Sequence, residues 1–147
     1  MRKILFLDFD GVLHGSSDFS NFGKLPALCR VLDQMPDVDI VISSTWRETY
    51  PLDLLKEYFP EHIRSRVIGG TPMLTEGYEQ GSRQREIEDY LALQGLHTGN
   101  AAWVALDDIA AFFDGNCPFL ILTDGRIGFQ EENGEHLLAW YRALHPQ

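Results

Sequence analysis

The feature of the sequence that most constrains the fold is the segment 4–13, in which an apolar run ends in two aspartates and a glycine. The run has the composition of a strand that is buried on both faces. Asp8 and Asp10 follow it, one residue apart, and Gly11 permits a sharp change of chain direction. In open α/β sheets, ligands bind beyond the carboxyl ends of the strands. The segment therefore predicts a buried strand that ends in a ligand site.

The two aspartates raise an electrostatic problem that a cation would solve. Within a regular strand, Asp8 and Asp10 would point to the same side. Two close carboxylates repel each other unless a cation lies between them or one keeps its proton. Turn chemistry accounts for one aspartate, but not for two that flank the apolar Phe9. We therefore expect a Mg²⁺ site, in which one aspartate binds the metal and attacks while the other moves a proton.

Length and composition are those of a soluble globular protein. The 147 residues are expected to form one domain over residues 1–147, and 44% hydrophobic with 23% charged residues is an ordinary balance. No run approaches the roughly 20 apolar residues of a membrane span. The first apolar run is interrupted at Asp8, unlike the core of a signal peptide. We therefore expect a cytoplasmic protein with no membrane partner, in which Cys29 and Cys117 are reduced thiols.

The formal net charge of −10 limits the possible partners. Lysine and arginine are few and scattered, so strong non-specific binding to DNA or RNA is not expected. A nucleotide or a nucleic-acid end could still enter a locally positive pocket.

The apolar pattern predicts strands that alternate with helices. We expect strands over 3–7, 38–42, 103–106 and 119–122, helices over 25–35, 51–59, 82–93 and 135–144, a short element at 63–68 and a helical turn at 109–113. Polar loops are expected over 14–24 and 71–81. This alternation favours a mostly parallel sheet with helices on both faces.

Three of the predicted strands end in polar residues, namely Asp8 with Asp10, Ser43 with Ser44, and Asp107 with Asp108. A doubly wound sheet would bring these three ends to one edge. Adjacent residues of a strand point to opposite faces, so we expect only one of the last two aspartates to reach the metal and the other to support it. One of them could also cap the segment that begins at Ile109.

Hydroxyl groups and an arginine near this edge are candidates for binding phosphate. Ser43 and Ser44 either contact a phosphate through hydroxyl and backbone N–H groups or simply cap the segment that contains Trp46. Arg47 either adds a bidentate phosphate contact or is an ordinary surface arginine.

A phosphate site also needs a fixed cation. Arg83 and Arg85 open the helix predicted over 82–93 and either supply that cation or belong to a solvated helix face. His14 follows the first motif and either points into the site or covers the loop, so its role stays open.

Together these motifs resemble those of the haloacid dehalogenase superfamily of hydrolases, and in the same order. The resemblance covers about the first three quarters of the chain, through LDFDGVL at 7–13 and VALDD at 104–108. The segment ISSTWR at 42–47 looks like a subgroup that includes domains similar to those attached to RNA-repair enzymes. The resemblance implies a three-layer, Rossmann-like, doubly wound and mostly parallel sheet with a minimal cap.

The resemblance also implies a mechanism, that of a Mg²⁺-dependent phosphomonoester hydrolase with a covalent aspartyl-phosphate. Asp8 would be the nucleophile, and Asp10 the general acid and then the general base. Mg²⁺ would be held by the side chain of Asp8, the backbone carbonyl of Asp10 and the side chain of Asp108, with Asp107 in support.

Phosphate ligands follow from the same resemblance. It puts a serine on the phosphoryl group, and the spacing from Trp46 favours Ser44 over Ser43. The third motif of the superfamily is usually a lysine. Here Arg83 stands at the matching distance, with Arg85 as its neighbour, and arginine keeps the charge without being equivalent to lysine.

The space left for a cap indicates an open site. Only about thirty residues separate Gly11 from Ser43, and they include a predicted helix. Within the superfamily, such minimal caps resemble those of enzymes that act on large substrates or on nucleic-acid ends. Three functions are therefore weighed: a Mg²⁺-dependent phosphomonoester hydrolase, a 3′- or 5′-end phosphatase of nucleic acids, and a non-catalytic module that binds Mg²⁺ or phosphate on the same fold.

Overall fold

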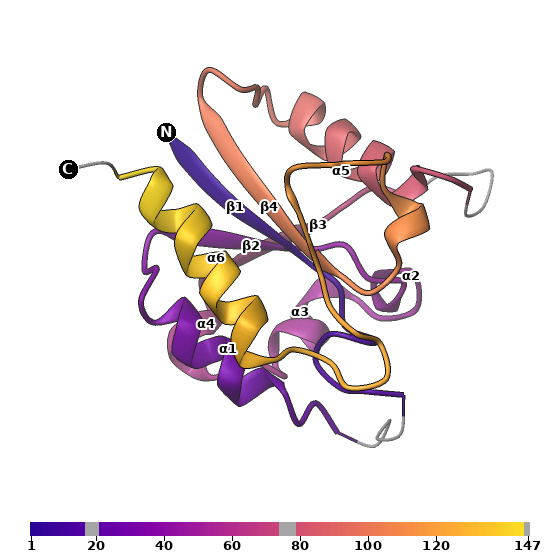
Figure 1. The fold of residues 1–147 in the computed structure, drawn as a ribbon, viewed down its shortest axis with the longest axis vertical. Coiled ribbons are helices and arrows are strands. Elements are labelled where there is room, and N and C mark those ends of the chain that lie inside the picture. The colour runs from indigo at the N-terminus through magenta and orange to yellow at the C-terminus, as the bar shows by residue number, and fades with distance from the viewer. Residues whose placement is uncertain (17–20, 74–78, 146–147) are drawn as a thin grey trace.

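A computed structural model describes residues 1–16, 21–73 and 79–145 (Figure 1). Its centre is a five-stranded sheet in the order β3-β2-β1-β4-β5, and every neighbouring pair is parallel. The strands are β1 (Arg2–Leu7), β2 (Val38–Ile42), β3 (Val67–Gly70), β4 (Ala101–Asp107) and β5 (Leu120–Leu122). The expectation of a mostly parallel sheet is confirmed.

Helices cover both faces of this sheet. They are α1 (Leu25–Leu32), α2 (Trp46–Thr49), α3 (Leu52–Lys56), α4 (Glu61–Arg64), α5 (Ser82–Leu93) and α6 (Glu131–Ala143), with a 3₁₀ turn η1 at Ala110–Phe112. Helices α1 and α6 contact each other on one face, and α5 lies on the other (Figure 1). The fold is therefore the three-layer, Rossmann-like α/β arrangement expected from the motifs. Over the described residues, none of the helices has the length and apolar character needed to traverse a membrane.

The strand order places a topological switch beside β1. The chain moves outward from β1 through β2 to β3, and then returns to the opposite side of β1 for β4 and β5. Leu7 at the end of β1 is level with Ile42 of β2 and with Leu106 of β4. The residues that follow Leu7 and Leu106 therefore emerge side by side at the switch point, where such sheets bind ligands.

Alternate residues of β1 belong to two separate cores, which explains why the strand is apolar throughout. Leu5 and Leu7 pack in a cluster with α1, α3 and α6. Ile4 and Phe6 pack on the other face, where the ring of Phe6 meets that of Tyr90 edge-on at a centroid distance of 5.7 Å. Packing on both faces holds β1 in a fixed place within the sheet, and it thereby fixes the position of the motif that follows β1.

The fold differs from the sequence expectation mainly between β2 and α5. The short element expected at 63–68 divides into α4 and β3, and β3 ends in Gly69 and Gly70, which have little intrinsic strand preference. The strand forms because it pairs with β2, through a register shift between Ile40 and Val41. Helix α2 was not expected as a separate element, and the helix expected over 51–59 is restricted to α3.

Two helix boundaries also differ, for local reasons. Helix α1 ends at Leu32 rather than near 35. Helix α6 begins at Glu131 rather than 135, because Gln130 and Asn133 form a reciprocal capping box around its first turn. The core positions of both helices are unaffected by these shifts.

Arg66 ties the turn between α1 and β2 to the rest of the sheet, and its replacement tests that tie. Its guanidinium donates hydrogen bonds to the carbonyl oxygens of Leu32, Met35 and Val38 at 3.1, 2.6 and 3.0 Å. Arg66→Met should lower the free energy of unfolding by about 2 kcal/mol, since three carbonyls lose a charged donor. Urea unfolding followed by circular dichroism measures this loss. The exposed Arg30→Met is the matched control, and an equal loss in both variants would contradict the account.

Candidate active site

Three carboxylates meet at the switch point. Asp8 follows β1, Asp107 is the last residue of β4, and Asp108 comes next. One ligand oxygen from each lies within 4.8 Å of the others. Asp8 and Asp107 are buried, at 5% and 0% exposed, whereas Asp108 is half-buried. The parallel register of β1 and β4 therefore builds an acidic cluster from segments about one hundred residues apart in the sequence.

A buried arginine reaches this cluster from the face of the sheet that α5 covers. Arg83 lies in the first turn of α5, and its Nη1 is 3.3 Å from Oδ1 of Asp8 and 3.0 Å from Oδ2 of Asp107. Its guanidinium also lies 5.1 Å from the ring centroid of Phe112, within range of a cation–π interaction. Arg85 points elsewhere, with an exposed side chain 3.9 Å from Glu79. Of the two arginines that open α5, the structure brings only Arg83 to the cluster.

The electrostatics of the cluster favour an additional cation. Burial is the main reason that the pKa of Asp8 is well above its usual value, and the charge of Asp107 raises it further while Arg83 opposes the shift. Burial likewise raises the pKa of Asp107, again opposed by Arg83. One guanidinium cannot balance three ionised carboxylates. A divalent cation with oxygen ligands would complete the balance, and three carboxylates are the donor set that suits Mg²⁺.

Two glycines make room for the third carboxylate. A β-carbon added to Gly11 would lie 2.2 Å from Oδ2 of Asp108, and one added to Gly125 would lie 2.6 Å from the same atom. Gly11 also has a φ of +77°, which disfavours any other residue. Thr123 donates a hydrogen bond of 2.7 Å to the carbonyl of Gly11. In the sequence, Thr123, Asp124 and Gly125 have the composition of a turn, and nothing in their spacing points to Asp108.

Asp10 is not one of the three clustered carboxylates. Strand β1 ends at Leu7, and the chain then turns, with the N–H of Leu13 donating to the carbonyl of Phe9 at 2.8 Å. The side chain of Asp10 is 51% exposed. The two motif aspartates therefore have different surroundings, and the like charges that act on Asp8 come from Asp107 and Asp108.

Two ring nitrogens contact one oxygen of Asp10. Nε1 of Trp46 donates to Oδ1 at 3.0 Å, and Nε2 of His14 lies 2.8 Å from the same oxygen. His14, whose role the sequence left open, is thus part of the site's surroundings rather than of the loop surface. The sequence placed Trp46 in the neighbourhood, but nothing in the sequence pattern linked its indole to Asp10.

The serines and the arginine after β2 are held mainly by the protein itself. Ser43 and Ser44 are buried, and Oγ of Ser44 accepts a hydrogen bond from the N–H of Trp46 at 3.3 Å. Arg47 donates to the carbonyls of Ser44 and Thr71 and pairs with Glu86 of α5, each at 2.7 Å. Arg47 therefore joins the loop after β2 to β3 and α5. The phosphate contacts expected of these three residues remain predictions.

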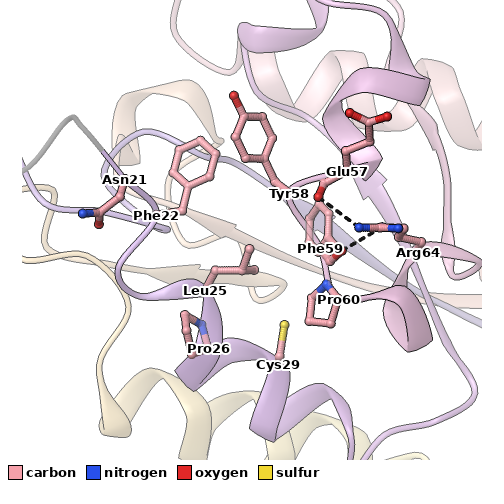
Figure 2. A pocket seen from close by; sticks show the side chains of 10 residues that line it. All are labelled: Asn21, Phe22, Leu25, Pro26, Cys29, Glu57, Tyr58, Phe59, Pro60 and Arg64. Atoms are coloured by element: carbon pink, nitrogen blue, oxygen red, sulfur yellow. Dashed lines mark hydrogen bonds between the residues drawn. The ribbon is translucent and has the colours of Figure 1, made fainter.

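The aromatic cluster around Trp46 shares two rings, Phe22 and Tyr58, with the lining of a hollow. The ring of Trp46 lies 5.1, 5.4 and 5.9 Å from those of Phe22, Tyr50 and Tyr58. Figure 2 shows the hollow, with Phe22 and Tyr58 along one edge and Arg64 donating to the backbone at the other. Its volume is about 620 Å³, and none of the three clustered aspartates lines it.

Removing one charge from the cluster should stabilise the metal-free protein. Because the folded-state pKa values of Asp8 and Asp107 are raised, their contribution to stability is present below about pH 4 and is lost as the pH rises through those values. Asp108→Asn should therefore raise the Tm at about pH 7.5 in EDTA by a few degrees. It should also reduce the further rise in Tm that excess MgCl₂ produces in the unaltered protein.

Thermal unfolding followed by circular dichroism, with and without MgCl₂, measures both effects. The exposed Asp89→Asn on α5 is the matched control and should change neither value. A lower Tm for Asp108→Asn in EDTA would contradict the charge repulsion within the cluster, and an undiminished response to MgCl₂ would show that the cluster does not bind the ion.

Comparison with known proteins agrees with this geometry. The family described as the HAD domain in Swiss Army Knife RNA repair proteins matches residues 4–133, which contain four of the strands, most of β1, the three clustered aspartates and Arg83. Neither the curated proteins nor the solved structures that were compared gave a match. The resemblance drawn from the motifs is thus confirmed over most of the chain. The chain belongs to the family of HAD domains found in Swiss Army Knife RNA repair proteins, within the HAD-like hydrolases.

Proposed function

We propose that the chain is a Mg²⁺-dependent phosphomonoester hydrolase in which Asp8 carries the phosphoryl group covalently. The observation that supports this most directly is the separation of the two motif aspartates. Asp8 is buried beside Arg83 and two further carboxylates, whereas Asp10 is half exposed and hydrogen-bonded to two rings. A nucleophile and a proton donor need such different surroundings.

The reaction proceeds in two steps. A carboxylate oxygen of Asp8 attacks the phosphorus, the bond from phosphorus to the leaving oxygen breaks, and Asp10 donates its proton to that oxygen. In the second step Asp10 takes a proton from a water molecule as the water oxygen attacks the phosphorus. The bond to Asp8 then breaks, which releases inorganic phosphate and returns both aspartates to their starting states.

The other residues of the site bind and orient. The side chains of Asp8 and Asp108 and the backbone carbonyl of Asp10 would hold Mg²⁺, with Asp107 in support through its pair with Arg83. When bound, the ion supplies positive charge to the phosphoryl oxygens. A serine after β2, with Ser44 preferred to Ser43, and the guanidinium of Arg83 would supply further donors to the same oxygens. Arg47 would hold the loop that carries the serines in place.

Loss of the nucleophile should abolish turnover. Asp8→Asn keeps the size of the side chain but cannot form the acyl phosphate, so we expect hydrolysis of p-nitrophenyl phosphate with MgCl₂ to fall by at least about a thousandfold. Release of p-nitrophenolate, followed by its yellow absorbance, measures the rate. The exposed Asp89→Asn should retain full activity.

Two outcomes would contradict the proposal. Unchanged turnover in Asp8→Asn would exclude Asp8 as the nucleophile. Inactivity of the unaltered protein toward a broad panel of phosphate esters, with Mg²⁺ present, would instead indicate a module that binds Mg²⁺ or phosphate without catalysis.

A second candidate, favoured by the aromatic cluster, is a phosphatase of nucleic-acid ends. Tyr50 and Tyr58 are 41% and 47% exposed, and both contact Trp46, whose indole is bonded to Asp10. Asp10 is the residue proposed to meet the leaving oxygen, so the leaving group would lie near these rings. Nucleobases stack on exposed aromatic side chains in this way. The net charge of −10 favours contact with the terminal nucleotides rather than with a long stretch of backbone.

Removing one of these rings should distinguish the two candidates. For a nucleic-acid end phosphatase, Tyr58→Ala should raise KM for a phosphorylated oligonucleotide by about tenfold, the usual cost of one lost stacking contact. It should leave KM for glycerol phosphate, which has no base, unchanged. Release of inorganic phosphate measures both. Phe119→Ala removes an exposed ring near β5 and is the control, and equal effects on the two substrates would exclude stacking.

A further inference from the structure

The proposed mechanism requires that Asp10 direct one oxygen at the leaving group, yet a carboxyl that is 51% exposed is free to rotate unless something holds it. The same oxygen, Oδ1, is contacted by both Trp46 and His14, at 3.0 and 2.8 Å. Within the described residues, Oδ2 makes no hydrogen bond. The two oxygens of Asp10 are therefore unequal in this structure.

The ring of His14 is fixed in the orientation that this contact needs. Its Nδ1 lies 2.8 Å from the carbonyl oxygen of Gly15, which can only accept, so Nδ1 carries a hydrogen and Nε2 is the atom that faces Asp10. The ring is 1% exposed and stacks on Phe22 at a centroid distance of 5.8 Å and an angle of 15°. Burial and stacking together leave it little freedom to turn away.

Trp46 is held as firmly on the other side. Its indole is a donor only, so its hydrogen bond must end on an acceptor such as Oδ1. The ring packs against Phe9, the residue between the two motif aspartates, at a centroid distance of 5.9 Å. The residue that links Asp8 to Asp10 thus also locates the ring that bonds Asp10.

We propose that His14 and Trp46 are positioning residues. Trp46 donates to Oδ1 of Asp10, and His14 donates to the same oxygen in the form that carries a hydrogen on both ring nitrogens, so that together they present Oδ2 to the leaving oxygen of a phosphate ester. The inference rests on the phosphatase function proposed above. Neither ring touches the reacting atoms, and their effect passes through the Asp10 carboxyl. With Oδ1 occupied by two donors, Oδ2 carries the proton that Asp10 transfers and later receives one from water.

The test uses esters that differ in their need for a proton donor. The leaving group of glycerol phosphate is a basic alkoxide that needs protonation, whereas the p-nitrophenolate of p-nitrophenyl phosphate leaves without it. Since kcat/KM reports transfer to Asp8, His14→Phe and Trp46→Phe should lower kcat/KM for glycerol phosphate by at least about tenfold more than for p-nitrophenyl phosphate. His14→Gln, whose amide can donate from a similar place, should recover most of the loss. A purely structural role would lower both esters equally.

A matched control exists on the surface. Nε2 of His62 lies 2.9 Å from Oδ1 of Asp33, in a histidine–aspartate pair that is exposed and remote from the acidic cluster. His62→Phe should leave the ratio of the two esters unchanged. Circular dichroism of every variant checks folding, and Trp46→Phe keeps the test decisive should His14→Phe fail to fold.

A second measurement does not depend on activity. In ¹⁵N-labelled protein, the indole N–H proton of Trp46 should resonate downfield of its usual position and move upfield in Asp10→Ala. The other two tryptophans, Trp103 and Trp140, should not respond. An unmoved Trp46 signal would overturn the hydrogen bond in solution, and the inference with it.

The outcomes separate this inference from the function on which it rests. If the unaltered protein hydrolyses both esters and Asp8→Asn abolishes this, but the ring variants lower both esters equally or neither, positioning alone is overturned. If the unaltered protein hydrolyses neither ester, the proposed function fails and the inference fails with it. A loss of kcat/KM that is selective for glycerol phosphate, and that is largely absent in His14→Gln, supports both the function and the inference.

Discussion

The site depends on a buried ion-pair network, in which one guanidinium is paired with carboxylates that the fold has removed from water. Arg83 reaches Asp8 and Asp107 at 3.3 and 3.0 Å, and all three side chains are almost completely buried. Removing one partner of such a set leaves an uncompensated charge and is costly. The fold holds the set together because the sheet fixes the two aspartates and α5 fixes the arginine. The remaining negative charge would favour a cation in the cluster.

Much of this fold could be predicted from the sequence because strands that are buried on both faces appear in it as continuous apolar runs. Strands β1, β2 and β4 were recognisable in that way, and helix α5 was recognisable from the helical spacing of its apolar residues. Strand β3 was not, since Gly69 and Gly70 join the sheet through pairing with β2 and through no preference of their own. Tertiary contacts decided that element, and such contacts are invisible in a local window.

The site shows the same division. Pairs of polar residues at strand ends predicted that Asp8 and Asp10 would lie at one edge with one of Asp107 and Asp108, because parallel strands share that edge. The structure brings both Asp107 and Asp108 to Asp8 and leaves Asp10 outside the cluster. The partners of Asp10 could not be predicted, since the bond from Trp46 depends on how a loop turns back over Phe9. Arg47 is instructive in another way, because its sequence position suits either a phosphate ligand or a surface residue. In the structure Arg47 connects the loop after β2 to Glu86 of α5, a role that neither interpretation of the sequence predicted.

The glycines beside Asp108 allow the geometry of the acidic cluster to be altered without any change of charge. Gly125 belongs to what looks like an ordinary surface turn, yet a single methyl group there would overlap Oδ2 of Asp108. Such a methyl would act as a spacer that displaces a carboxylate while every ionisable group of the site is kept. Net charge and titratable groups would then be those of the native protein, and only the distance between the acids would differ. Geometry could be separated from charge at this one position.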